Sequence, residues 1–161
     1  MRNSIALVLA MVLAASAGSA FADATAIAKA HDEAFGKACA AGDVKAVLAL
    51  YTDDAHVIWP GAGEEAKGKA ALEKLATGLC DPKRGTQAVL KDVVGLQLDP
   101  THVAIIGHWD FTQNGPDGKP VASQIRASEI IVRTPHGWRY VVDHASIGMP
   151  PAEAAKTAAN E

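Results

Sequence analysis

The sequence lacks the short motifs that mark the commonest cofactor, metal and nucleophile sites. It has no Gly-x-Gly-x-x-Gly fingerprint, no His-Glu-x-x-His or Cys-x-x-Cys spacing, and no Gly-x-Ser-x-Gly elbow. Basic runs are also missing, and acidic residues outnumber Lys and Arg by 18 to 15. These absences argue against a nicotinamide-dependent oxidoreductase, a metal site, a serine nucleophile and a nucleic-acid partner.

Cysteine is scarce, with only Cys39 and Cys80 in the chain. Neither residue stands beside a histidine or at a predicted helix start, so the sequence does not favour a reactive thiolate. A disulfide between them would join the first and third predicted helices. Two buried, unpaired thiols fit the sequence equally well, and the pairing stays open at this point.

Long apolar runs are confined to the N-terminus. Arg2 precedes an apolar stretch over residues 5–15, and Ala20-Phe21-Ala22 matches the small-x-small pattern of a cleavage site. These features are typical of a secretory signal peptide. The stretch is shorter than the roughly 20 residues that span a bilayer. We therefore expect cleavage after residue 22 and a periplasmic or secreted protein without a membrane contact, with one domain over residues 23–149 and a flexible tail over 150–161.

Periodicity and turn residues predict three helices followed by strands. The helices are expected at residues 23–41 and 43–50 and around Leu72–Leu79, where Asp81-Pro82 ends the third. Strands are expected at residues 56–59, 88–98, 103–112, 124–133 and 138–147, and residues 61–67 are expected to form a loop. This order predicts an α+β fold with the helices on one face of a curved, mostly antiparallel sheet.

Two stretches resemble the NTF2-like superfamily. The first runs from Ala41-Gly42-Asp43-Val44 to Leu72, and the second is the hairpin that contains Trp138-x-x-Val141-x-x-His144-x-Ser146. They are similar to SnoaL-type cyclases, ketosteroid isomerases, the small DUF4440 and SgcJ/EcaC-type proteins, and the association hub of calmodulin-dependent kinase II. The resemblance implies a cone-shaped fold with a pocket between the helices and the sheet.

The resemblance also implies candidate positions in that pocket. The catalytic base of ketosteroid isomerases falls on Trp59, which cannot abstract a proton, whereas their second carboxylic acid falls on Glu129. The arginines of the kinase hub map onto Asp110, Glu129 and Ala145, none of which is basic. The pocket is therefore expected to take a small apolar ligand that is neutral or cationic.

Strand alternation supplies the remaining candidates. If Asp110 and Glu129 both face the pocket, burial and like charge raise at least one pKa, which suits general acid–base catalysis. The alternative is that they point to solvent or form ordinary ion pairs with neighbouring arginines. The expected ligand-binding residues are Tyr51 as a hydroxyl donor, Trp59 as a wall, and His108, which shares a face with Asp110.

The sequence thus leaves two functions open. One is an exported small-molecule binder or cofactor-independent enzyme of the isomerase, cyclase or dehydratase type, without a metal. The other is a non-catalytic module that assembles through the outer face of the sheet as a homodimer or a larger ring, with Trp109, Phe111, Val132 and Tyr140 as apolar residues that fit either the core or the interface.

Overall fold

The structure is a computed structural model that describes residues 24–60 and 65–148. The signal peptide expected at residues 1–22 and the tail expected at residues 150–161 lie outside the described residues. Among the described helices, none is both long and apolar enough to span a membrane.

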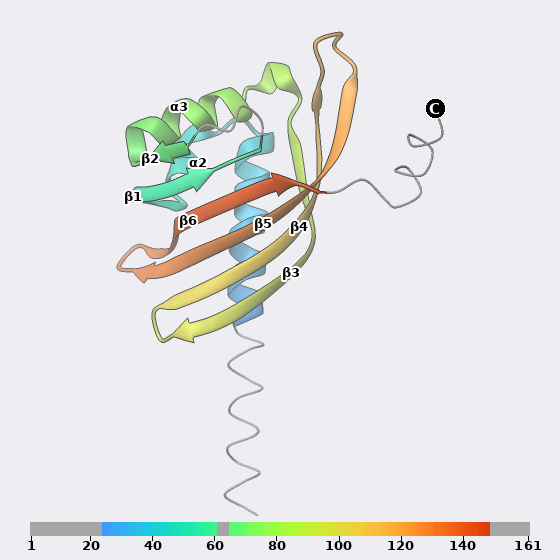
Figure 1. Cartoon of the computed structure of the whole chain (residues 1–161). Helices are drawn as coiled ribbons and strands as arrows, with labels where there is room; N and C mark the ends of the chain where they lie inside the picture. Colours follow the sequence, from blue (N-terminus) through green and yellow to red (C-terminus); the bar gives the residue numbers. More distant parts are fainter. Residues whose placement is uncertain (1–23, 61–64, 149–161) are drawn as a thin grey trace, which may run out of the picture.

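A curved sheet carries the helices on one face, as Figure 1 shows. The strand order is β2-β1-β6-β5-β4-β3, in which β1 and β6 are parallel and the other neighbours antiparallel. A first helix over residues 24–40 crosses the inner face of the sheet. The α+β prediction is therefore confirmed. The other elements are α2 (Val44–Leu48), α3 (Lys69–Leu79), a 3₁₀ turn η1 (Pro82–Arg84), β1 (Tyr51–Ile58), β2 (Glu65–Lys67), β3 (Gln87–Asp99), β4 (His102–Asn114), β5 (Pro120–Thr134) and β6 (Gly137–Ile147).

Local signals explain where the helices begin and end. Gly42 follows the first helix with a φ of 69°, a conformation that glycine adopts without strain. Asp43 then caps α2, because its Oδ1 accepts a hydrogen bond of 2.9 Å from the amide of Ala46. In α3 the buried residues are Leu72 and Ala76, which lie one turn apart on the inner side of the helix.

The first strand is longer than expected. It begins at Tyr51 rather than His56, so Tyr51 lies on β1 and not at the end of a helix. The pairing of β1 with β6 shifts register between Tyr51 and His56, which hides the two-residue alternation that marks a strand. The expected loop also contains β2, whose Ala66 pairs with Val57.

Cys39 and Cys80 form a disulfide, with their Cα atoms 4.7 Å apart. The alternative of two unpaired thiols is thereby excluded. The bond ties the first helix to the residue that follows α3, beside Leu79. It therefore braces the helical side of the fold.

Close packing of the first helix on β3 leads to a stability prediction. A Cβ at Gly36 would lie only 2.6 Å from the backbone oxygen of Ala88, whereas a Cβ at Gly78 in α3 would meet nothing within 4 Å. We expect Gly36→Ala to destabilise the protein by about 1–3 kcal/mol through overpacking. Gly78→Ala should stabilise it by up to about 1 kcal/mol through helix propensity.

Urea unfolding of both variants measures the difference. The two substitutions are chemically identical and both fall in helices, so Gly78→Ala is the matched control. Equal changes in the free energy of unfolding would contradict the close approach of the first helix to β3.

Candidate functional site

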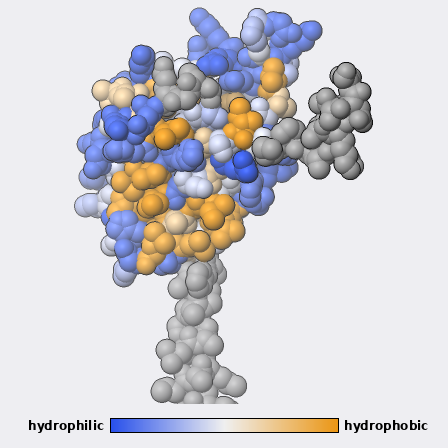
Figure 2. Space-filling view, in the orientation of Figure 1, coloured by the Kyte–Doolittle hydropathy of each residue, from blue (hydrophilic) through white to orange (hydrophobic). Residues whose placement is uncertain are grey.

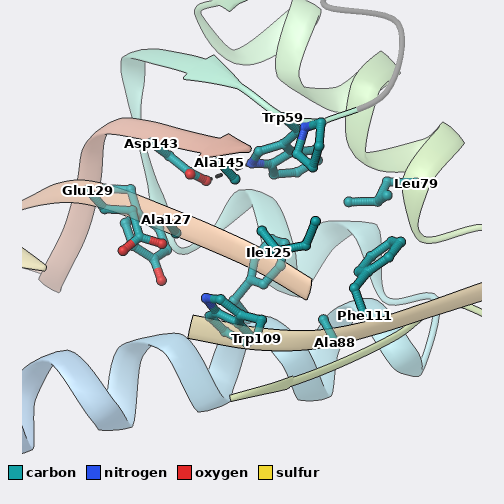
Figure 3. A pocket seen from close by; sticks show the side chains of 13 residues that line it. Trp59, Leu79, Ala88, Trp109, Phe111, Ile125, Ala127, Glu129, Asp143 and Ala145 are labelled. Atoms are coloured by element: carbon teal, nitrogen blue, oxygen red, sulfur yellow. Dashed lines mark hydrogen bonds between the residues drawn. The ribbon is translucent and has the colours of Figure 1, made fainter. Parts of the chain in front are cut away.

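A narrow pocket lies between the inner face of the sheet and the helices (Figure 3). Its volume is about 50 Å³, and most of the side chains around it are apolar. Its polar lining residues are Glu129, Tyr140 and Asp143, and Figure 3 shows Glu129 and Asp143 at one end. The remaining lining residues are Phe35, Trp59, Pro60, Leu79, Ala88, Trp109, Phe111, Ile125, Ala127 and Ala145.

The pocket adjoins a wider basin of about 680 Å³. Trp59, Pro60, Leu79 and Phe111 line both spaces. Ligand pockets for small molecules usually measure about 300–1,000 Å³. The basin therefore provides the room that the narrow inner pocket lacks.

Two carboxyl groups come from neighbouring positions on paired strands at the polar end. Glu129 on β5 pairs directly with Asp143 on β6, and both side chains are buried, each about 5% exposed. The register of these strands shifts between Ile130 and Ile131, where Val142 and Tyr140 are the partners. Because of this bulge, Tyr140 and Asp143 both turn inward although they are three residues apart.

Asp143 is held by two hydrogen-bond donors. Its Oδ2 accepts a bond of 2.6 Å from the hydroxyl of Tyr51 and one of 2.7 Å from Nε1 of Trp59. No donor among the described residues bonds to its Oδ1. These bonds favour the carboxylate form of Asp143 over that of Glu129, whose Oε2 has no hydrogen-bond partner among the described residues, although burial raises the pKa of both groups.

A third buried carboxyl group comes from the first helix. Asp32 is fully buried, and its Oδ1 accepts a hydrogen bond of 2.6 Å from the hydroxyl of Tyr140. Within the described part of the chain, Asp32 Oδ2 and Glu129 Oε2 are buried without a hydrogen-bond partner. Three acidic side chains from three elements therefore lie near one another, of which Glu129 and Asp143 line the pocket and Asp32 is buried beyond its lining.

Burial shifts the acidity of these groups. Desolvation raises the pKa of Glu129 to about 10, and the nearby charges of Asp32 and Asp143 add to the shift. Desolvation also raises the pKa of Asp32 to about 7, against the hydrogen bond from Tyr140. For Asp143 burial raises the pKa, while the bonds from Trp59 and Tyr51 oppose the rise. At neutral pH Glu129 is therefore protonated and can donate a hydrogen bond.

His31 lies next to this cluster as a neutral side chain. Its ring centroid is 4.3 Å from that of Tyr140, and its Nε2 lies 3.2 Å from the backbone oxygen of Leu50. Burial lowers the pKa of His31 to about 4. At neutral pH it contributes no positive charge to balance the carboxyl groups.

Three of the sequence-predicted site residues meet at the pocket. Glu129 lies at its polar end, and Trp59 forms part of its wall. Tyr51 does not line the pocket, but its hydroxyl donates a hydrogen bond to Asp143, which does. Their roles in binding or catalysis stay predictions.

The other two candidates, Asp110 and His108, lie on the outer face of β4, so the expected meeting of Asp110 with Glu129 is wrong. Asp110 instead forms an ion pair of 3.0 Å with Nζ of Lys91, and Nδ1 of His108 lies 2.7 Å from Asp92. Trp109 and Phe111, which alternate with His108 and Asp110 along β4, point to the inner face of the sheet. The helices cover this inner face. These two residues and Tyr140 therefore line the pocket and do not offer surface for an interface.

Sequence reasoning missed Asp32 and Asp143. A signal existed for Asp32, which lies between Ala28 and Phe35 on the helix face that becomes buried. Asp143 stands two residues before Ala145, a position that the resemblance already placed in the cavity. Across the described residues, no group of three or more His, Cys, Asp or Glu side chains is arranged to hold a metal ion.

Comparisons with known proteins agree with this architecture. A family model described as "SnoaL-like domain" matches residues 28–150. The fold is similar to a ketosteroid isomerase-like protein from Erwinia carotovora atroseptica, with 22% identity, a TM-score of 0.65, and coverage of 78% of this chain and 97% of that one. It is also similar to an NTF2-like protein with a cystatin-like fold from Novosphingobium aromaticivorans, with 18% identity, a TM-score of 0.66, and coverage of 88% and 92%. A search of curated proteins finds no match.

Proposed function

We propose, from the premise that the chain belongs to the family of SnoaL-like domains, that it binds a small, largely apolar molecule and transfers protons on it without a cofactor. The observation that carries this proposal is the pairing of Glu129 with Asp143 across two strands at the end of an apolar pocket. Two neighbouring carboxyl groups that differ in their hydrogen bonding can act as acid and base, with the negative charge on the group that accepts more hydrogen bonds. The likeness to a ketosteroid isomerase-like protein agrees with proton transfer.

Each carboxyl group has a defined role in this proposal. Protonated Glu129 donates a hydrogen bond, or its proton, to an oxygen of the substrate. The carboxylate of Asp143, held at Oδ2 by Tyr51 and Trp59, accepts a proton from a neighbouring carbon at Oδ1. Isomerisation, cyclisation and dehydration all use this pair of proton transfers.

The charge of the pocket supports a neutral or cationic ligand. Glu129 and Asp143 line the inner pocket, Asp32 lies behind them, and no Lys or Arg is among the residues that line it, whereas Lys74 and Arg84 line the outer basin. An anionic group would therefore be repelled from the inner pocket. Trp59, Trp109, Phe35 and Phe111 offer the apolar contacts that a ring-shaped molecule needs.

Proton exchange tests the proposal before the natural substrate is known. The mature protein is incubated in D₂O with cyclohexanone and 2-tetralone, and loss of the α-proton signal is followed by NMR. We expect the α-protons to exchange faster with the protein present than in the same buffer without it. Neither sample contains added cofactor or metal. If the ketones bind but their protons do not exchange faster, the protein is a ligand binder without this catalysis. If the ketones do not bind, the proposal is overturned.

We also propose that the mature protein is exported to the periplasm or the medium. The sequence of residues 1–22 supports export, and so does the Cys39–Cys80 disulfide, because disulfides persist in oxidising compartments. Mass spectrometry of the exported fraction should find a chain that begins at Asp23. A full-length chain retained in the cytoplasm would contradict export.

A second candidate function is assembly, with a second copy of the chain as partner. The outer face of the sheet supports it, because apolar side chains gather there (Figure 2). Val94, Leu96, Ile106 and Val142 are 36–49% exposed and lie on strands β3, β4 and β6, on either side of β5. Burying this patch against its symmetry mate would form a homodimer.

Analytical sedimentation of the purified protein measures its oligomeric state and so tests this prediction. We expect a dimer that Ile106→Lys converts to a monomer, since the charge would be buried at the centre of the patch. Asp117→Lys, in the exposed β4–β5 turn, is the charge-changing control. A monomer for the unmodified chain at all concentrations would dismiss assembly.

A further inference from the structure

The wider basin differs from the inner pocket in the sign of its charge. Lys74 on α3 and Arg84 on η1 line the basin, whereas the inner pocket has no Lys or Arg among its lining residues. Both side chains belong to exposed residues, so a ligand in the basin can reach their charges. The proton transfer proposed above uses neither of them.

The two cations border the same side of the basin. Nη1 of Arg84 donates a hydrogen bond of 3.3 Å to the backbone oxygen of Gly78. Lys74 precedes Gly78 by four residues in α3, so both lie on one flank of the helix. The bond to Gly78 uses one of the five N–H donors of the guanidinium, which leaves the others for a ligand.

Neither cation forms an ion pair within the described part of the chain. Among the described residues that line the basin, the acidic one is Glu65. Its Oε1 already lies 3.4 Å from Nζ of Lys67 and 3.5 Å from Nδ1 of His56. The positive charge of Lys74 and Arg84 is therefore left for an anion from outside the chain.

The basin has room for part of a ligand that also enters the inner pocket. A Cβ at Gly78 would meet nothing within 4 Å, and Ala71 on the same helix adds only a small side chain to the lining. Trp59, Leu79 and Phe111 line both spaces. A single molecule can thus extend from the inner pocket into the basin.

The two spaces together have an acidic end and a basic end. Figure 3 shows Glu129 and Asp143 at one end of the inner pocket, and Leu79 and Phe111 at the other. Leu79 and Phe111 also line the basin, so the cations lie beyond the apolar end. An anionic group on a ligand is repelled by the acidic end and attracted by the basic end, which fixes the direction in which the ligand binds.

We infer that the basin is a subsite for an anionic group, such as a carboxylate, which Lys74 and Arg84 bind while the apolar part of the same ligand enters the inner pocket. The ligand is then an apolar molecule with a charged outer end. This inference rests on the proposed binding function of the pocket. It adds Lys74 and Arg84 as residues that determine specificity and direct the neutral end of the ligand toward Glu129 and Asp143.

Three compounds with one skeleton test the subsite: 3-phenylpropanoate, 3-phenylpropanamide and methyl 3-phenylpropanoate. Their affinities for the mature protein are measured by NMR titration at neutral pH. We expect the carboxylate to bind about three- to tenfold more tightly than the amide and the ester at low salt, the worth of one or two exposed ion pairs. About 0.5 M NaCl should remove most of this preference, because salt screens exposed charges.

Charge-removing variants tie the preference to the named residues. Lys74→Gln and Arg84→Gln should each reduce the preference for the carboxylate, and the double variant should abolish it while the amide still binds. Lys45→Gln is the matched control, because this exposed lysine of α2 lines neither space. Thermal unfolding of each variant confirms that it is folded.

The outcomes separate this inference from the proposed function. Equal affinity for the carboxylate and the amide, or an unchanged preference in the double variant, would overturn the anion subsite while leaving a binding pocket. An equal loss of preference in Lys45→Gln would also overturn it, since the effect would then come from the charge of the whole protein. No binding of any probe would overturn both proposals.

A crystal structure with 3-phenylpropanoate tests the direction of binding. We expect the carboxylate within hydrogen-bond distance of Lys74 or Arg84 and the phenyl ring in the inner pocket. A carboxylate that lies beside Glu129 and Asp143, with the ring in the basin, would overturn the inference.

Discussion

Asp143→Asn is expected to slow proton exchange by about 10²- to 10⁴-fold, the usual contribution of a general base. Asparagine has nearly the same shape, and its amide oxygen can still accept from Tyr51 and Trp59, which bond to Oδ2 of the aspartate. It cannot accept a proton from carbon. Binding of a ketone probe should therefore change little, while the exchange rate falls.

Asp110→Asn is the matched control for this variant. Asp110 lies on the outer face of β4 in an exposed ion pair with Lys91. Exchange should therefore remain at the rate of the unmodified protein. If Asp110→Asn lost the activity and Asp143→Asn kept it, the assignment of the base would be wrong.

Glu129→Gln is expected to reduce the dependence of stability on pH between about pH 7.5 and 9.5 by the contribution of one proton. The pKa of Glu129 is raised from its ordinary value of 4.5 to about 10 in the folded protein, chiefly by burial. A group with a raised pKa stabilises the fold fully below its unfolded pKa, and this stability is lost as the pH rises through the folded value. Between these values the folded state holds one proton more than the unfolded state.

The size of this effect follows from proton linkage. One extra proton in the folded state lowers the free energy of unfolding by about 1.4 kcal/mol per pH unit. The window avoids His31, whose pKa is lowered to about 4, and lies above the value of about 7 for Asp32. Glutamine resembles the protonated acid and does not titrate, so the slope should become shallower by the contribution of this one proton, and any slope that remains belongs to other groups with a raised pKa, such as Asp143.

Urea unfolding at several pH values measures both slopes. Asp92→Asn, an exposed acidic residue of β3, is the control and should keep the slope of the unmodified protein. A flat profile in the unmodified protein would show that Glu129 is already ionised at neutral pH. It would then be unable to serve as the proton donor of the proposed mechanism.

Local interactions made much of the fold predictable. Capping by Asp43, the stop after Gly42, and the alternation in the four long strands depend on neighbours in the chain, and these elements are present. The resemblance likewise placed Glu129 in the pocket, where it lies. The start of β1 was missed because a register shift breaks the alternation between Tyr51 and His56.

The composition of the acidic cluster depended on tertiary structure. Alternation alone separates Asp110 from Trp109, but it does not say which face the helices will cover. Apolar packing decided this, since Trp109 and Phe111 contact the pocket and Asp110 turns to solvent. The partner of Glu129 is therefore Asp143 on β6.

The sequence by itself determined the order of helices and strands, the superfamily and one acidic pocket residue, because these follow from short-range patterns. Only the tertiary structure brought together Asp32, Glu129 and Asp143, which come from a helix and two strands far apart in the chain. A bulge in the β5–β6 pairing turned Asp143 inward beside Tyr140. Burial, which no local pattern measures, then raised the pKa values of these three residues.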